Sequence, residues 1–275
     1  MIRRGSSTRR GAGCSGRLIV AALVAIFSLI TYFSSRQDNP VTGETQYVDM
    51  TVEQEIALGL QAAPEMAEQY GGLDPDSNAQ ALVDEIGQGI VANSPAGLSP
   101  YQFDFHLLDD AQTINAFALP GGQIFITRAL FDRLQTEGEL AGVLGHEVGH
   151  VIGRHSAEHI AKARLTEGLS GAAVIASYDP DNPASMRTAQ VAIMIGQLVN
   201  LKFGRDDELE SDFLGVCFLN DAGYDPSELI RVMEVLASAS QGQAPPEFFS
   251  THPNPENRVQ RIQEAIQNLD QCPSG

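Results

Sequence analysis

Hydrophobic and polar residues follow two different periods along this chain, which predicts both helices and a small sheet. From Thr51, a candidate N-cap, apolar residues recur every three or four positions, and the same spacing returns from Ser77. Residues 101–108 then alternate between apolar and polar, and two short apolar runs, 114–119 and 123–127, flank a Pro-Gly-Gly turn. We therefore predict three strands, the last two of which form a hairpin.

A helical period dominates the rest of the chain. A long helix is expected to begin at Glu137 and to continue to about Arg164. Three further helices are predicted towards the C-terminus, at about 205–221, 226–239 and 254–269. Because helices outnumber strands and no internal repeat is visible, we expect one α+β domain, helix-dominated, with its small β-sheet near the start.

Two apolar stretches rich in alanine and glycine, 168–177 and 190–201, lie between the long helix and the later ones. Neither is long enough to cross a bilayer by itself, since a spanning helix needs roughly 20 apolar residues. We interpret both as core helices, in preference to a membrane-facing surface.

The first 36 residues differ in composition from the rest. They contain six arginines and no acidic residue, and a nearly unbroken apolar run extends over residues 18–33. This pattern favours a signal-anchor helix whose arginine-rich end stays in the cytoplasm, which places residues 37–275 in the periplasm of a bacterium, attached to the inner membrane. The alternatives are a cleaved signal peptide, which leaves a secreted or periplasmic protein, and a buried core helix. A lipoprotein is excluded because Cys14 precedes the apolar run.

These boundaries predict a basic segment with a transmembrane helix at 1–36, a linker at 37–50 and a globular domain at 51–275. The net charge of the chain is −18, and residues 37–275 hold 11 basic against 35 acidic side chains. A phosphate-binding surface needs clustered lysine and arginine, so nucleic acid is excluded as a partner. We attribute the acidic charge to solubility.

Cysteine usage gives little structural information. Three cysteines are too few for a disulfide scaffold or for a four-cysteine zinc module. An oxidising compartment would permit a Cys217–Cys272 bond. We expect Cys217 to be a buried free thiol instead, because it lies in the apolar sequence Leu-Gly-Val-Cys-Phe-Leu.

The strongest chemical signal is the sequence His146-Glu147-Val-Gly-His150. The predicted helix is otherwise almost entirely apolar over residues 139–153, and burying three titratable groups without partners would cost several kcal/mol. Histidines four positions apart project from one helix face and can together bind one zinc ion per chain. The glutamate beside them is placed to take a proton from a water on that metal. We predict a zinc site with His146 and His150 as ligands and Glu147 as general base.

The third ligand is less directly specified. Metzincin proteases carry a histidine ten positions after the first, where this chain has Ser156, and His155 comes one position early. We interpret His155 and His159 as surface residues or as neighbours of the ligands. The other solution is a carboxylate from a later helix, which completes a His, His, Glu site with water in the fourth position.

The acidic segment at the start of the later helix offers this carboxylate. Glu208 and Asp212 are four positions apart and share a face, so that one can bind zinc while the other accepts the ring N–H of a histidine ligand. The residue types alone leave the ligand open among Asp206, Asp207, Glu208 and Glu210.

Together these motifs resemble the zinc metallopeptidase family that contains HtpX, BepA, LoiP and the CAAX prenyl proteases, the forty-eighth metallopeptidase family. The resemblance covers about residues 50–269 and rests on His-Glu-Val-Gly-His, Glu-Leu-Glu-Ser-Asp and two further segments, 115–127 and 251–258. It implies a zincin-like gluzincin domain in a single-domain, LoiP-like form, without a tetratricopeptide extension or a lipid-attachment cysteine. It also implies Glu208 as the third ligand and Asp212 as its neighbour. Ser211 stands where the family usually has alanine.

Further residues receive expected roles. An edge strand is expected to bind an extended peptide through main-chain hydrogen bonds, at Asn115, Ala116, Phe117 and Ala118. The resemblance implies that His252 approaches the zinc, either stabilising the oxyanion or filling the open position in a latent state. Arg258 is expected to pair with an acid such as Asp212.

The expected function is that of a membrane-anchored, zinc-dependent endopeptidase that acts on unfolded or damaged proteins near the membrane, in envelope protein quality control. Two other classes stay open: a catalytically weak, chaperone-like protein of the same fold that binds unfolded clients, and a zinc hydrolase of a non-peptide bond. The presence of Glu147 together with a full ligand set favours the peptidase.

Overall fold

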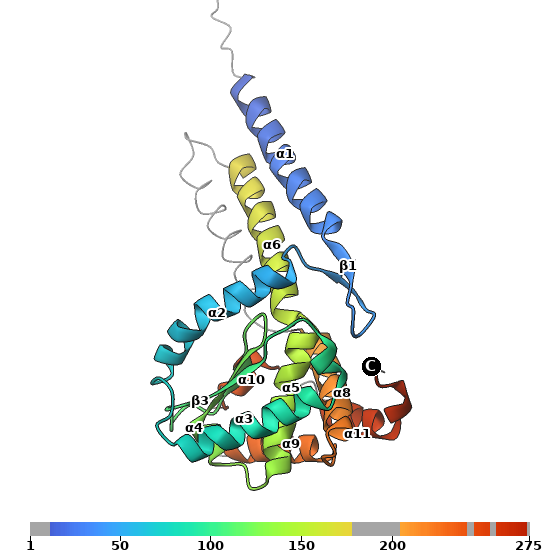
Figure 1. The fold of residues 1–275 in the computed structure, drawn as a ribbon. Helices are drawn as coiled ribbons and strands as arrows, with labels where there is room; N and C mark the ends of the chain where they lie inside the picture. Colours follow the sequence, from blue (N-terminus) through green and yellow to red (C-terminus); the bar gives the residue numbers. More distant parts are fainter. Residues whose placement is uncertain (1–11, 178–203, 241–244, 254–256, 274–275) are drawn as a thin grey trace, which may run out of the picture. The chain divides into compact units, whose positions relative to one another are not determined.

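The structure, a computed structural model, describes residues 12–177, 204–240, 245–253 and 257–273 (Figure 1). The chain divides into two compact units. One contains Met1–Arg36, Tyr47–Asp49 and Ile160–Leu201, and the other contains Gln37–Gln46, Met50–His159 and Lys202–Gly275. The predicted stretch 190–201 and residues 254–256 of the C-terminal motif lie outside the described residues.

The smaller unit contains helix α1, Ala12–Ser34, and the part of helix α6, His155–Ser177, that follows Ile160. Within the described residues, Gly16–Ser34 is the one helical segment long and apolar enough to cross a membrane. Figure 1 shows α6 beside α1, and the described residues of 168–177 take no part in the core of the larger unit. The interpretation of 168–177 as a core helix of the globular domain is therefore wrong, because Gly168 packs against Ser28 of α1 instead.

The larger unit is built on a three-stranded sheet in the order β3-β5-β4. The central strand pairs parallel with β3 and antiparallel with β4, so the predicted hairpin is confirmed; the bounds are β3 Asp104–Leu108, β4 Ala116–Ala118 and β5 Gln123–Thr127. Gly121 in the hairpin turn has a φ of 83°, and a Cβ there would lie 2.4 Å from the Ile56 Cα. Only glycine permits this approach of the turn to helix α2, Val52–Gln69.

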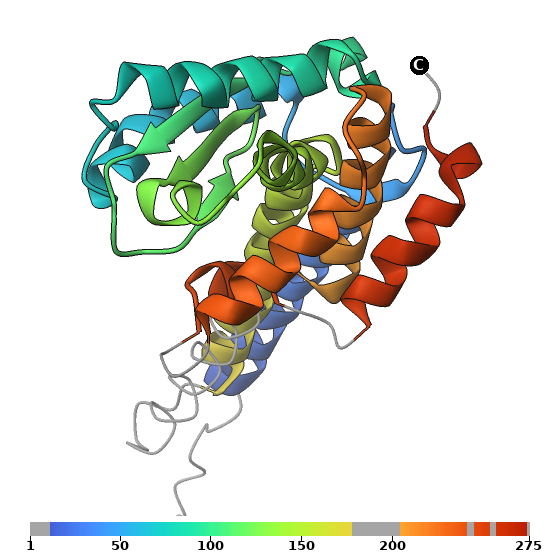
Figure 2. The same cartoon turned by 90° about the horizontal axis from the view of Figure 1, so that it is seen from below.

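Helices cover both faces of this sheet. Helix α2 packs on one face, and the main core lies on the other, between the strands and helices α3, Ser77–Ala92, and α5, Glu137–Ile152. Helix α5 lies between the strands and α8, Arg205–Asp221, and also contacts α9, Glu228–Ala239 (Figure 2). Helix α11, Arg258–Gln267, packs against α8. The shorter elements are β1 Arg36–Asp38, β2 Thr45–Tyr47, η1 Pro95–Leu98, α4 Arg128–Phe131, α10 Phe248–Thr251 and η2 Leu269–Gln271.

The prediction of a single helix from Glu137 to Arg164 is wrong, because the helix is interrupted between α5 and α6. Arg154 has a φ of 57°, a left-handed conformation that residues other than glycine rarely adopt. Its buried guanidinium donates from Nε to the buried Glu55 carboxylate at 3.1 Å and from Nη2 to the Met50 carbonyl at 3.3 Å. These tertiary contacts stabilise a break that helical periodicity does not reveal.

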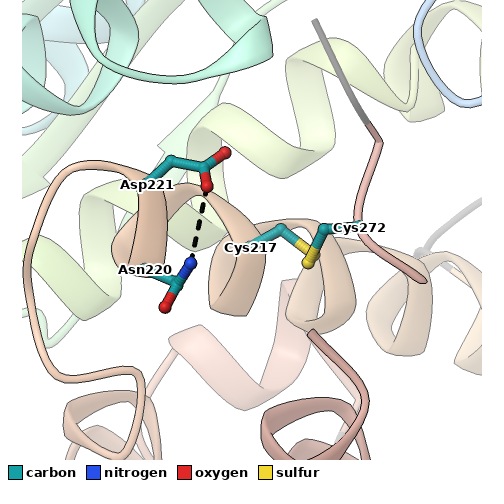
Figure 3. The surroundings of a disulfide bond; sticks show 4 residues. All are labelled: Cys217, Asn220, Asp221 and Cys272. Carbon is teal, nitrogen blue, oxygen red and sulfur yellow. Dashed lines mark hydrogen bonds between the residues drawn. A yellow bond between two sulfur atoms is a disulfide. The ribbon is translucent and has the colours of Figure 1, made fainter. Parts of the chain in front are cut away.

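The expected free thiol at Cys217 is also wrong, because this residue forms a disulfide with Cys272 (Figure 3). The two Cα atoms lie 5.6 Å apart although the residues are separated by 55 positions in the sequence. Packing of α11 against α8 carries the C-terminal segment to the buried Cys217 side chain. The apolar sequence context predicts the burial of Cys217 correctly, but it does not say which residue lies beside it.

Candidate active site

The site is built where α8 approaches α5 most closely. His146, Glu147 and His150 lie on α5 and are each at most 1% exposed. A Cβ at Gly149 would lie 2.7 Å from the Ser211 carbonyl oxygen, so glycine is needed for the two helices to come this close. Ser211 also donates from Oγ to the His146 carbonyl at 2.7 Å, a bond that the usual alanine cannot make. The approach brings the Glu208 carboxylate beside both imidazoles.

Four side chains converge at this point. The Nε2 atoms of His146 and His150 lie 3.0 Å apart, and the Glu208 carboxylate oxygens lie 3.6 Å from the first and 3.4 Å from the second. One ligand atom from each of these residues and from His252 falls within 4.8 Å of all the others. Two nitrogens bound to one tetrahedral zinc ion are roughly 3.3 Å apart, so this donor set fits such an ion. Burial holds the pKa of His150 well below its ordinary value, which favours the neutral, metal-binding form.

Glu147 is buried beside this cluster. Within the described residues neither of its carboxylate oxygens has a hydrogen-bond partner, and Oε1 lies 3.7 Å from His252 Nε2. Burial raises the pKa of Glu147, although the charges of His252 and His146 act in the opposite direction. A carboxylate with a raised pKa and uncommitted oxygens is suited to proton transfer.

The second ring nitrogen of His146 faces a buried ion pair. Its Nδ1 lies 2.9 Å from Asp212 Oδ1, and Asp212 accepts two hydrogen bonds from Arg258. Burial alone would raise the pKa of Asp212, but the Arg258 charge and the His146 contact lower it. Arg258 Nη1 also lies 3.2 Å from Glu208 Oε2. The expected contacts of Asp212 with a histidine and with Arg258 are both present.

The second ring nitrogen of His150 faces another histidine. Its Nδ1 lies 2.9 Å from His155 Nδ1, and His155 Nε2 lies 3.2 Å from Glu210 Oε2. His155 is buried beside a candidate ligand, so of the two interpretations given to it the surface one is wrong. On an unbroken helix it would lie about 140° around the axis from His150, whereas the break at Arg154 turns it inward. Gly153 is the local signal for that break.

Two of the expected residues, Asp207 and His159, lie beyond this cluster. His159 Nε2 lies 2.7 Å from Asp207 Oδ2, and both side chains are partly exposed. Burial raises the pKa of Asp207, but the hydrogen bond with His159 and the charge of His155 outweigh it and lower the pKa. This pair connects the start of α6 to the start of α8 without reaching the four converging ligand atoms.

His252 reaches the cluster from the end of α10. Its Nδ1 lies 3.0 Å from Glu208 Oε1, and its ring stacks on Phe248. Burial lowers the pKa of His252, but the charges of Glu147 and Glu208 outweigh it and raise the pKa. The Phe248 N–H donates to the Ile114 carbonyl at 3.2 Å, which joins α10 to the chain just before β4.

A second contact near β4 was not predicted from the sequence. The Tyr70 hydroxyl donates to Glu247 Oε1 at 2.7 Å, and the Asn115 amide nitrogen lies 3.4 Å from both groups. Burial and the neighbouring Glu247 raise the pKa of Tyr70 to about 12. The residue that begins the predicted substrate strand therefore contacts the segment that carries His252. No sequence motif predicts this contact, because Tyr70, Asn115 and Glu247 come from three distant segments of the chain.

Strand β4 lies at the edge of the sheet. Its hydrogen bonds to β5 show which main-chain N–H and C=O groups remain available to bind a peptide. Asn115 and Leu119 bond to β5, through Thr127 N to Asn115 O at 3.0 Å and through Leu119 N to Gln123 O at 2.8 Å. Because antiparallel pairing alternates, the main-chain groups of Ala116 and Ala118 point away from β5. These are the groups that an added strand would meet.

Comparisons with known proteins agree with this site. A sequence model of peptidase family M48 matches residues 77–266, more than half of the chain. The chain is 30% identical over 239 residues to the mitochondrial metalloendopeptidase OMA1 of Schizosaccharomyces pombe, covering 86% of this chain and 68% of that protein. It is 31% identical to the beta-barrel assembly-enhancing protease of Yersinia pestis and 28% to that of Escherichia coli, over 80% and 88% of this chain. It spans about half the length of these two bacterial relatives, 45% and 50%.

Proposed function

The chain belongs to peptidase family M48, and from this premise we propose that it is a membrane-anchored, zinc-dependent endopeptidase. The observation that carries the proposal is the convergence of His146, His150 and Glu208 beside the buried carboxylate of Glu147. The relatives named as metalloendopeptidase and protease support a peptide bond as the target.

Each residue of the site has a part in this proposal. His146, His150 and Glu208 hold the zinc ion, which when bound polarises the scissile carbonyl and lowers the pKa of a water ligand. Glu147 takes a proton from the attacking water and delivers it to the leaving amine nitrogen. Asp212 keeps the His146 ring in its orientation, and Arg258 keeps Asp212 ionised.

Substrate binding is assigned to β4 and control of access to His252. An extended peptide adds to the edge at Asn115–Ala118 and bonds to the outward main-chain groups of Ala116 and Ala118, which gives little side-chain selectivity. The bonds from α10 and Glu247 to this region support a state in which His252 closes the site. When α10 moves away, the His252 ring becomes available to stabilise the oxyanion.

The cellular location rests on two observations. Nearly all large apolar side chains of α1 are exposed, which supports its insertion into a bilayer. The Cys217–Cys272 disulfide supports an oxidising compartment for the larger unit, which matches the periplasmic side of a bacterial inner membrane. Unfolded or damaged envelope proteins are the substrates that this position favours.

The test compares zinc content and casein cleavage in purified wild type, Glu147→Gln and the control Glu234→Gln. Glu234 is an exposed carboxylate on α9. We expect all three proteins to bind zinc and Glu147→Gln to lose at least about 10²-fold in cleavage rate. Zinc retained with equal cleavage by wild type and Glu147→Gln would overturn the peptidase proposal. If none of the proteins cleaves casein and all suppress its aggregation, the chaperone-like alternative is supported.

A further inference from the structure

In the smaller unit, helix α6 packs along α1, the helix that we propose crosses the membrane. Three contacts show that α6 packs along α1 and that the two helices are antiparallel. A Cβ at Gly168 would lie 2.1 Å from Ser28 Oγ, so the helices nearly touch there. Arg17 at the start of α1 donates from Nη2 to the Ile175 carbonyl at 3.3 Å near the end of α6. At the other end, Thr31 and Leu165 line one cavity.

The contact surface between these helices has the composition of a membrane helix interface. On α1 the least exposed of the described side chains is Ala21, on the same face as Ser28. Within residues 165–176 of α6 it is Ala172, four positions after Gly168. Small residues let helix backbones approach closely, which is the usual basis of helix association in lipid. Most large apolar side chains of α1, by contrast, are exposed.

One end of the helix pair carries the residues expected at a bilayer surface. Tyr32 stacks on Tyr47 with ring centroids 4.9 Å apart, and Phe33 meets Tyr47 edge-on at 5.9 Å. Arg164 pairs with Asp49 at 2.6 Å at the same level of α6. Aromatic and charged side chains gather at membrane–water boundaries, so Leu165 and the residues after it lie on the lipid side of this boundary.

We propose that residues 165–177 of α6 are immersed in the same bilayer as α1, so that the protein is held by an antiparallel pair of helices rather than by α1 alone. The inference rests on the anchoring part of the proposed function. If α1 crosses the membrane, a helix that packs along it from Thr31 to Arg17 must lie in the same bilayer. Within 165–177 the one charged residue is Glu167, near the boundary. The segment is about 20 Å long, so it enters a bilayer of about 30 Å without crossing it.

The lipid acyl chains are the partner of the outer face of α6. Leu169 and Ala173 are exposed, as are most large apolar side chains of α1. The anchor therefore includes the helix that follows the HExxH helix directly along the chain.

The test uses single spin labels on the full chain in a Cys14→Ser background, in which the remaining cysteines are bridged. The protein is reconstituted into vesicles of phosphatidylethanolamine and phosphatidylglycerol. Collision with oxygen, which concentrates in lipid, is compared with collision with a water-soluble nickel chelate. The test position is Ala173→Cys, the lipid control is Leu23→Cys on α1, and the water control is Arg231→Cys on α9.

We expect the labels at 173 and 23 to collide more with oxygen than with nickel, and the label at 231 to do the reverse. A water pattern at 173 with a lipid pattern at 23 overturns the inference and leaves the anchor standing. A water pattern at 23 overturns both. Protection of position 173 from both reagents also overturns it, because protein rather than lipid then covers this face of the helix.

A second measurement checks the packing itself. Oxidation of the double variant Ser28→Cys with Gly168→Cys is expected to consume both thiols, since a Cβ at Gly168 meets the Ser28 side chain directly and a small outward shift brings the pair to disulfide distance. The matched control, Ile30→Cys with Gly168→Cys, places the partner on the exposed face of α1 and should keep both thiols. Equal thiol loss in the two pairs contradicts the arrangement.

Discussion

Arg258 on α11 donates two hydrogen bonds to the Asp212 carboxylate on α8, from Nε to Oδ2 at 2.6 Å and from Nη2 to Oδ1 at 2.8 Å. Both side chains are buried, and Asp212 meets the ring of His146. The last helix of the chain is thereby tied to the first histidine of the site through one fully desolvated ion pair. Two-point contact of this kind fixes orientation as well as charge.

Removing Arg258 should damage stability and metal binding together. In Arg258→Met the Asp212 charge stays buried without its partner, which is expected to lower the free energy of unfolding by about 3–5 kcal/mol. Zinc affinity is expected to fall about 10- to 100-fold because the His146 ring loses its fixed neighbour. Urea denaturation and zinc titration measure the two effects. The control is Arg261→Gln on the same helix, an exposed residue whose loss should cost less than about 0.5 kcal/mol.

Reduction of the Cys217–Cys272 bond should destabilise the larger unit without removing the metal ligands. The closed loop spans 55 residues, and the loop-entropy model gives about 4 kcal/mol for a loop of that length. We expect Cys272→Ser to lose about 2–4 kcal/mol in urea denaturation. Dithiothreitol should lower the midpoint of the wild type and leave that of Cys272→Ser unchanged. An unchanged wild-type midpoint in reductant would show that the bond does not support the fold.

Peptide binding at β4 can be tested at Ala118, whose main-chain N–H points to the free edge. Ala118→Pro removes that donor without breaking a bond to β5, since Leu119 rather than Ala118 bonds to Gln123. Loss of one main-chain hydrogen bond to substrate should reduce kcat/KM about three- to tenfold, with zinc content unchanged. The control Ala118→Ser keeps the N–H and should retain activity. Equal kcat/KM for the proline variant and wild type would remove β4 from the binding site.

Tyr70 should make the fold lose stability at high pH. Its pKa is raised from 10 to about 12 in the folded protein by burial and by Glu247. The unfolded chain therefore releases this proton near pH 10 while the folded protein keeps it, so the contribution is complete below pH 10 and declines as pH rises towards 12. Tyr70→Phe should lack this decline in its free energy of unfolding. In a tyrosinate absorbance titration, the difference between wild type and variant should titrate near pH 12; a midpoint near 10 would contradict the contact with Glu247.

Most helices and all three strands of the larger sheet follow from local pattern. The capping residue Thr51 and the bounds of α8 at 205–221 agree with the structure, because each depends on neighbours in sequence. The break after α5, the disulfide and the position of 168–177 were mispredicted. Each of these is decided by a distant partner: Glu55 for Arg154, Cys272 for Cys217, and Ser28 for Gly168.

The residues of the site can be separated in the same way, into those that local spacing predicts and those that only the tertiary structure brings together. Spacing alone determined that His146 and His150 share a helix face with Glu147 beside them, because an α-helix repeats every 3.6 residues. Local sequence left four acidic residues as equal candidates for the third ligand, and only the approach of α8 at Gly149 turned Glu208 towards the histidines. The tertiary structure also decided that His155, Tyr70 and Glu247 belong to the surroundings of the site. Periodicity describes one element at a time, whereas contacts between elements depend on how their faces pack, and that packing is a property of the whole fold.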